Sequence, residues 1–169
     1  MTTDPLTAAR TAIASGQWQH ALDLLDELDG PTAASLEVRA QAAYGNGQFD
    51  AAVQAWEDLH TLLSAEGDDA EAARAAAMIA MYLMMDSGLM APVRGWLRRA
   101  ERLLEGHDQA AAHALVAMVR TYERFMCGDM HTAREQAERA IEIGTRLGVT
   151  PAVVIGRTAL ARTEILAGN

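Results

Sequence analysis

Small and apolar residues recur along the chain at the spacing of one face of an α-helix. After Gly16, Gly47, Gly88 and Gly128, such residues stand five, nine and twelve positions later. Spacings of i, i+4 and i+7 place side chains on the same helical face, so each segment is expected to bury one side. The residues of this predicted face are Ala21, Leu25, Leu28, Ala52, Trp56, Leu59, Val93, Leu97, Ala100, Ala133, Ala137 and Ala140.

The same glycines mark a repeat. Each follows an alanine-rich segment, and the intervals from Gly16 through Gly168 are 31, 41, 40 and 40 residues. Glycine ends helices readily because it adopts the left-handed conformation without a Cβ penalty. A period of this size is typical of solenoids. The pattern therefore predicts an all-α solenoid of antiparallel helix pairs.

Boundary signals give about nine helices in a single domain. Asp4-Pro5 and Thr150-Pro151 each combine an N-cap residue with proline at the first helical position, Asp108 is expected to cap another helix, and Gly30-Pro31 separates the first two pairs. The repeats are expected at about 5–30, 31–67, 68–107 and 108–148, with a half repeat at 149–169. The expected helices are 5–15, 18–29, 32–45, 49–65, 69–87, 90–105, 108–127, 130–147 and 150–167.

The turn sequences resemble the tetratricopeptide repeat (TPR), in which Gly-x-Trp/Phe-x-x-Ala joins the two helices of a pair. The matching small position seven residues before the glycine is occupied by Ala9, Ala40 and Ala161, but by Met81 and Thr121 in the third and fourth repeats. The repeat proline is also missing, and the period exceeds the usual one. The resemblance implies a right-handed α-solenoid.

Two segments, 93–106 and 128–140, are similar to the repeat region of large bacterial transcriptional regulators of the LuxR type. This resemblance implies a regulatory context in which nucleotide-binding and helix-turn-helix modules lie elsewhere. The last expected helix lacks a partner, and an uncapped solenoid end exposes an apolar face. We therefore expect a fragment of a longer protein, or a homodimer formed through this helix.

Composition limits the chemistry. All 14 basic residues are arginines, which excludes Schiff-base lysines, P-loops and Ser-Lys nucleophiles. A formal charge of -9 argues against direct nucleic-acid binding. Cys127, the single cysteine, rules out an intrachain disulfide, and no export signal or membrane-length apolar run is found. A cytoplasmic location, without membrane contact, is expected.

No residue pattern indicates catalysis, a cofactor or a metal. Cys127 is expected to pack at a helix C-terminus rather than act as a nucleophile. Arg94, Arg98 and Arg102 are expected to form a solvated face, paired with Glu101 and Glu105 of the same helix. Five histidines show no i, i+4 pair that would hold a metal: His20, His60, His107, His113 and His131. We expect no enzyme.

In the TPR family the first helix of each pair lines a concave, ligand-binding side. Transferred to this chain, the family offsets imply an apolar and aromatic groove. Its predicted residues are Glu37, Gln41, Tyr44, Met78, Tyr82, Met85, Met118, Tyr122, Phe125 and Arg162, with Thr158 and Ile165 beside them. The alternatives are that these side chains fill a tight superhelix, or that a shift of one position brings core methionines into the list.

A continuous Met, Tyr and Phe surface would suit an apolar partner, because methionine adapts to varied shapes. The leading hypothesis is a regulatory scaffold that binds a protein segment or peptide in the groove. One alternative is a sensor that encloses an apolar small molecule near Tyr82, Met85 and Tyr122. Another is an oligomerisation arm that acts through the last helix.

Overall fold

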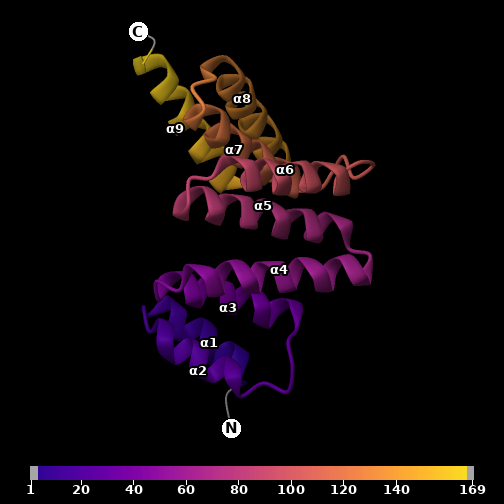
Figure 1. Cartoon of the computed structure of the whole chain (residues 1–169). Helices are drawn as coiled ribbons and strands as arrows, with labels where there is room; N and C mark the ends of the chain where they lie inside the picture. Colours follow the sequence, from indigo (N-terminus) through magenta and orange to yellow (C-terminus); the bar gives the residue numbers. More distant parts are fainter. Residues whose placement is uncertain (1–3, 167–169) are drawn as a thin grey trace. The chain divides into compact units, whose positions relative to one another are not determined.

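The computed structural model describes residues 4–166, and every regular element in that range is a helix (Figure 1). The all-α prediction is confirmed. None of these helices combines the length and apolarity needed to cross a membrane. The helices are α1 (Pro5–Ala14), α2 (Trp18–Asp26), α3 (Ala33–Gly45), α4 (Phe49–Glu66), α5 (Asp69–Asp86), α6 (Met90–Leu103), α7 (Ala112–Met126), α8 (Met130–Leu147) and α9 (Thr150–Leu166).

The repeated glycine turns have the expected conformation. Gly16, Gly47, Gly88 and Gly128 all have positive φ, between 64° and 78°. At the first turn the amide of Gln17, which follows the glycine, donates to the carbonyl of Ala12 at 2.8 Å. Such a bond satisfies a carbonyl that the helix end leaves open. The turns therefore reverse the chain, and the second helix of each pair packs back on the first.

Helix starts agree less uniformly with the expectation. Asp4 caps α1 by accepting a hydrogen bond from the amide of Thr7. Asp108 was expected to cap the seventh helix, and this prediction is wrong, because α7 begins at Ala112 and has no side-chain cap. Residues 104–111 instead form successive turns, in which His107 donates to Leu104 and Ala110 to His107 through backbone bonds.

The chain divides into two compact units, which we call the N-terminal unit (up to Asp68) and the C-terminal unit (from Asp69). The single-domain assignment stays a prediction. In the N-terminal unit α1 packs on α2 and α3, and α3 packs on α2 and α4. Gly45 is the last residue of α3, where a Cβ would clash with the ring of Trp18.

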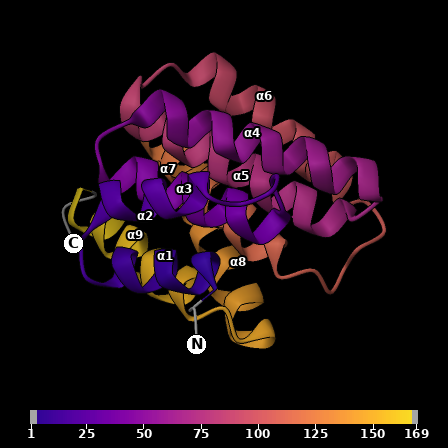
Figure 2. The same cartoon turned by 90° about the horizontal axis from the view of Figure 1, so that it is seen from below.

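In the C-terminal unit α7 is the central helix, in contact with α5, α6, α8 and α9 (Figures 1 and 2). Its core is built around the alanines of α5 and the apolar sides of α6 and α7. Alanine lets helices approach closely because its side chain occupies little space. Gly156 of α9 serves the same purpose against α8, since a Cβ there would meet the carbonyl oxygen of Ala137 at 3.0 Å.

The periodic face is buried as expected in both units. Eleven of its twelve residues are buried, and Leu28 is half-buried. Trp56, Leu59, Leu97 and Val93 are among the largest fully buried side chains in the described residues. The spacing after each glycine therefore identified the inner side of α2, α4, α6 and α8.

Candidate functional site

An apolar cleft of about 440 Å³ lies in the C-terminal unit. Three helices form it, α5, α7 and α9, and each is the first helix of an expected pair. The lining residues, which we call the methionine cleft, are Met81, Met84, Met85, Met118, Val119, Tyr122, Met126 and Ile155. Five of the eight are methionines, so the cleft is lined by long, unbranched and polarizable side chains.

Helical spacing brings these residues together. On α7, Met118, Tyr122 and Met126 follow one another at intervals of four and so lie on one side of the helix. On α5, Met81 and Met85 have the same interval. Because α7 packs on both α5 and α9, these faces meet at one place.

The cleft has a buried floor and an exposed rim. Met84, Met118 and Val119 are buried, whereas Met85 and Met126 are 59% and 56% exposed. Large apolar side chains that stay this exposed often mark an interaction site when they form a contiguous patch. The cleft is therefore open to a partner at its rim.

Three of the predicted groove residues, Met85, Met118 and Tyr122, line the methionine cleft. Tyr82 is buried and lies outside the cleft lining. Met78 and Phe125 are half-buried and also lie outside the lining. The sequence reasoning missed Met81, Met84, Met126 and Ile155. Each of the three methionines among them is adjacent in sequence to a predicted residue. For these residues the predicted register was therefore wrong by one position, which is part of a helical turn.

The other predicted residues lie elsewhere. Glu37 and Gln41 line a separate, more polar cleft of about 330 Å³ between α1 and α3, together with Arg10. Tyr44 packs edge to face on Phe49, with ring centroids 5.3 Å apart. Arg162, like Thr158 and Ile165, is exposed on α9 and does not line the methionine cleft.

A buried carboxylate, Glu123, stands at the centre of an ion-pair cluster between α6 and α7. Its side chain has no exposed surface, and Arg94 of α6 donates to it at 2.6 Å. Arg120 and Arg124, neighbours on α7, approach the second carboxylate oxygen at 3.5 and 3.1 Å. Arg120 also binds Glu101 of α6 at 2.7 Å. The arginines of α6 were expected to pair within their own helix, and for Arg94 the observed partner is instead on α7.

The electrostatics of Glu123 favour its charged form. Burial alone raises the pKa of this carboxyl, but the hydrogen bond from Arg94 and the charges of Arg124 and Arg120 outweigh burial and hold the pKa below its ordinary value. A carboxylate whose charged form is stabilised by arginines in this way is a structural link between helices rather than an acid or a base. The sequence holds one signal for this buried carboxylate. Glu123 stands seven residues after Val116, on a helical face of α7 that is otherwise apolar.

Cys127 belongs to the same cluster. It lies at the C-terminus of α7 as predicted, but the expectation that it is packed there is wrong. The residue is exposed, because it is the C-cap of α7 at the glycine turn. Its sulfur accepts a hydrogen bond from Nη2 of Arg94 at 2.9 Å. Among residues 4–166, no three His, Cys, Asp or Glu side chains gather in a way that could hold a metal ion.

Comparisons with protein-family models, with curated proteins and with solved structures each found no match. The tetratricopeptide and LuxR resemblances therefore stay predictions from sequence.

Proposed function

We propose that this chain is a non-catalytic binding scaffold that takes an apolar segment of a partner protein, a peptide or a helix, in the methionine cleft. The observation that carries the proposal is the cleft itself, an open apolar recess of about 440 Å³ lined by five methionines and one tyrosine. Flexible thioether side chains adapt to varied apolar surfaces, and the hydroxyl of Tyr122 offers a polar group that would orient the ligand.

The proposal includes a TPR-like solenoid and a regulatory role. Contacts between first helices, α1 with α3, α5 with α7 and α7 with α9, support the repeat arrangement inside each unit. In such arrays the first helices present a shared surface to ligands, and the methionine cleft is formed by first helices alone. The LuxR-like context is proposed on the sequence resemblance only.

Replacing both rim methionines with glutamine tests the cleft. Glutamine is similar in length to methionine but polar, and Met85 and Met126 are exposed, so Met85→Gln/Met126→Gln leaves the core intact. A labelled helical peptide with leucines on one face and glutamines on the other is titrated by fluorescence anisotropy. We expect the variant to bind about 10- to 100-fold more weakly, equivalent to about 1.4–2.8 kcal/mol of lost apolar contact.

Leu89→Gln is the matched control. Leu89 is 63% exposed, close to Met85 in sequence, and outside the cleft lining. Its substitution should leave peptide affinity unchanged. Equal loss in both variants, or no loss in either, contradicts binding in the methionine cleft.

A small-molecule sensor is the second candidate function, favoured by the volume of the cleft. Ligand pockets span roughly 300–1,000 Å³, and the methionine cleft lies inside that range. A sensor would bind compact apolar compounds, such as fatty acids or aromatic hydrocarbons, more tightly than helical peptides. Competition between such compounds and the labelled peptide on the same protein distinguishes the two functions.

The oligomerisation arm stays a third proposal. Val154 and Ile165 are exposed on the side of α9 opposite its buried residues Ala152, Ala159 and Thr163. Light scattering over a range of protein concentrations tests it, since a constant monomer mass argues against self-association through α9.

A further inference from the structure

The exposed methionines of this chain are gathered in one place. Of the eight methionines that the structure describes, only Met85 and Met126 are exposed, at 59% and 56%. Both line the methionine cleft, one in the last turn of α5 and the other at the last residue of α7. The thioethers that solvent reaches first are therefore those of the cleft rim. The other six methionines are buried or half-buried: Met78, Met81, Met84, Met90, Met118 and Met130.

A thioether in solvent reacts with peroxides. The sulfur lone pair attacks one oxygen of the peroxide, the O–O bond breaks, and that oxygen stays on sulfur as a sulfoxide. With hydrogen peroxide the departing oxygen takes the proton of the transferred one and leaves as water, so sulfur is oxidised and the peroxide is reduced. A buried thioether meets the oxidant only when the structure opens locally, which slows its reaction. The rim of the cleft is therefore expected to be oxidised before its floor.

A sulfoxide changes the rim from apolar to polar. Its oxygen accepts hydrogen bonds, and burying such a group without a donor is unfavourable. Among the side chains that line the cleft, Tyr122 alone carries a hydrogen-bond donor, its hydroxyl. An apolar partner brings no further donor. Oxidised Met85 and Met126 therefore keep water at the rim and oppose dry contact with the partner.

We infer that Met85 and Met126 are oxidation sites, and that their conversion to methionine sulfoxide by a peroxide releases the partner from the methionine cleft. This inference rests on the proposed function. Both residues and the cleft belong to the C-terminal unit. Methionine sulfoxide reductases reverse the step, because two thiols of the reductant form a disulfide and the sulfoxide oxygen leaves as water. The rim is thus a reversible switch between an apolar and a polar surface.

Oxidation of the rim is expected to leave the fold intact. Met84 and Met118 belong to the hydrophobic core between α5, α6 and α7, whereas Met85 and Met126 do not. A sulfoxide in that core would disrupt close packing. At the rim the sulfoxide oxygen stays in water. The switch therefore changes binding rather than stability, and circular dichroism distinguishes the two.

Cys127, next to Met126, is a second kind of oxidisable sulfur on the surface. Its thiol also reacts with peroxides. Cys127→Ser removes this reaction, and the serine hydroxyl can accept the hydrogen bond that Arg94 donates to the sulfur. The experiment therefore uses the Cys127→Ser chain as its parent.

Hydrogen peroxide is added to the parent until about two oxygen atoms per chain are incorporated. Peptide mass spectrometry locates the sulfoxides, and fluorescence anisotropy measures the affinity of the helical peptide that has one leucine face. We expect Met85 and Met126 to be oxidised before the other described methionines. Affinity should then fall about 10- to 100-fold, while the circular dichroism spectrum stays the same. A methionine sulfoxide reductase with a dithiol should restore the affinity.

Leucine variants test whether these two sulfurs cause the loss. Leucine cannot form a sulfoxide and keeps the rim apolar, so peptide binding to Met85→Leu/Met126→Leu stays measurable. The readout is the ratio of affinities before and after peroxide, which should be about 1 in this variant. Met90→Leu/Met130→Leu is the matched control, because both residues are half-buried and lie outside the cleft lining. Its affinity before peroxide should equal that of the parent, and peroxide should reduce it as much.

The outcomes separate the inference from the proposed function. If Met85→Gln/Met126→Gln weakens peptide binding but sulfoxides at the same two residues do not, the oxidation switch is overturned and the cleft remains a binding site. Sulfoxides that form first at other methionines, or an equal loss of affinity in Met85→Leu/Met126→Leu, also overturn the switch. Absence of peptide binding to the untreated parent overturns both.

Discussion

Glu123 is a fully buried carboxylate held by arginines from two helices, and its removal tests that cluster. Breaking a buried ion pair by removing one partner leaves charges without compensation and costs about 3–5 kcal/mol. The arginines here keep part of their exposure, so for Glu123→Gln we expect a loss of about 3 kcal/mol in the free energy of unfolding. Urea denaturation at neutral pH measures it.

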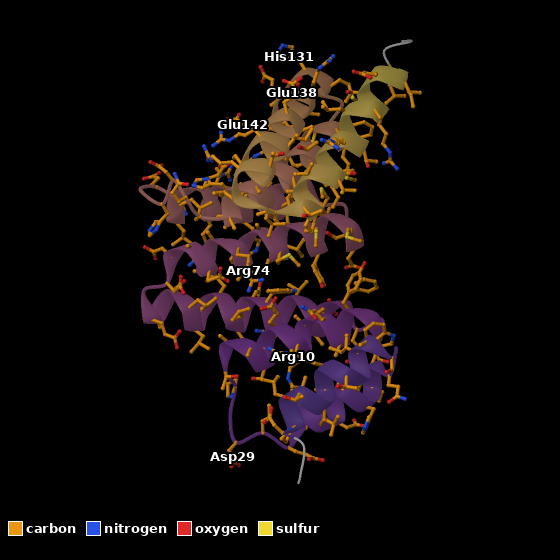
Figure 3. All side chains as sticks on the ribbon, turned by 180° about the vertical axis from the view of Figure 1, so that it is seen from behind. Arg10, Asp29, Arg74, His131, Glu138 and Glu142 are labelled. Carbon is orange, nitrogen blue, oxygen red and sulfur yellow. The ribbon has the colours of Figure 1, made fainter. Side chains whose placement is uncertain are left out.

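Glu138→Gln is the control for this substitution. Glu138 pairs with Arg134 at 3.3 Å on an exposed side of α8 (Figure 3), and such surface pairs contribute about 0–1 kcal/mol.

The stabilisation that Glu123 provides depends on pH, and the sign of this dependence follows from its pKa. Because the folded pKa of Glu123 is lowered, its stabilisation is present above about pH 4.5 and is lost as the pH falls through the folded pKa. The difference between wild type and Glu123→Gln should therefore shrink on acidification, and a constant difference contradicts this assignment.

For individual residues, the sequence predicted the chemical character of the surface better than it predicted which side chains are buried or paired. It indicated an apolar, methionine-rich surface on the first helices, but it placed Tyr82 there although that residue lies outside the cleft lining. Whether a side chain on α5 faces the cleft or the core depends on how α5 is rotated about its own axis against α7. The spacing of residues within α5 does not determine this rotation. Cys127 and Glu123 show the same limit, because their partner Arg94 comes from another helix.

The contact between α8 and α9 depends on glycine. A Cβ on Gly156 would lie 2.8 Å from Cγ1 of Ile141 and 3.0 Å from the backbone oxygen of Ala137, and a backbone atom cannot rotate away. We expect Gly156→Ala to destabilise the fold by about 1–3 kcal/mol. Gly95→Ala, in α6 of the same unit, meets no atom within 4 Å and should stabilise by about 0.5–1 kcal/mol through helix propensity. Urea unfolding followed by circular dichroism compares them, and opposite signs are the expected result.

Helices and their inner sides followed from the sequence because glycine turns and i, i+4, i+7 spacing are local signals. Asp108, expected to cap the seventh helix, was a weaker guide to where that helix begins. An N-cap residue starts a helix only if the following residues continue it, and residues 108–111 make turns instead. The close approach at Gly156 was not foreseen, since glycine inside a helix is unfavourable by propensity and is explained only by the neighbouring helix.

At the scale of the whole molecule, the net charge is divided unequally between the two units, and the total composition does not reveal this. Residues 1–68 contain 11 acidic residues and two arginines, whereas residues 69–169 contain 12 of each. A formal charge of -9 argued against nucleic-acid binding, but it did not show that one unit holds all of it. That division depends on the boundary at Asp68, which is a property of contacts between helices rather than of any local motif. The acidic N-terminal unit and the neutral, cleft-bearing C-terminal unit are therefore expected to respond differently to salt.

Amide hydrogen exchange at two salt concentrations measures this difference. Like charges in the N-terminal unit repel one another in the folded state, and raising the salt from about 0.01 M to 0.15 M screens that repulsion. Amides of α1 to α4 should then exchange about fivefold more slowly, equivalent to ~1 kcal/mol of added stability. Amides of α5 to α9 should change little, because opposite charges there are balanced and the Glu123 cluster is buried. The chain with Glu27→Gln, Asp29→Asn and Glu66→Gln should show a smaller salt response in α1 to α4 only, and a uniform response in both units would contradict the assignment of charge to one of them.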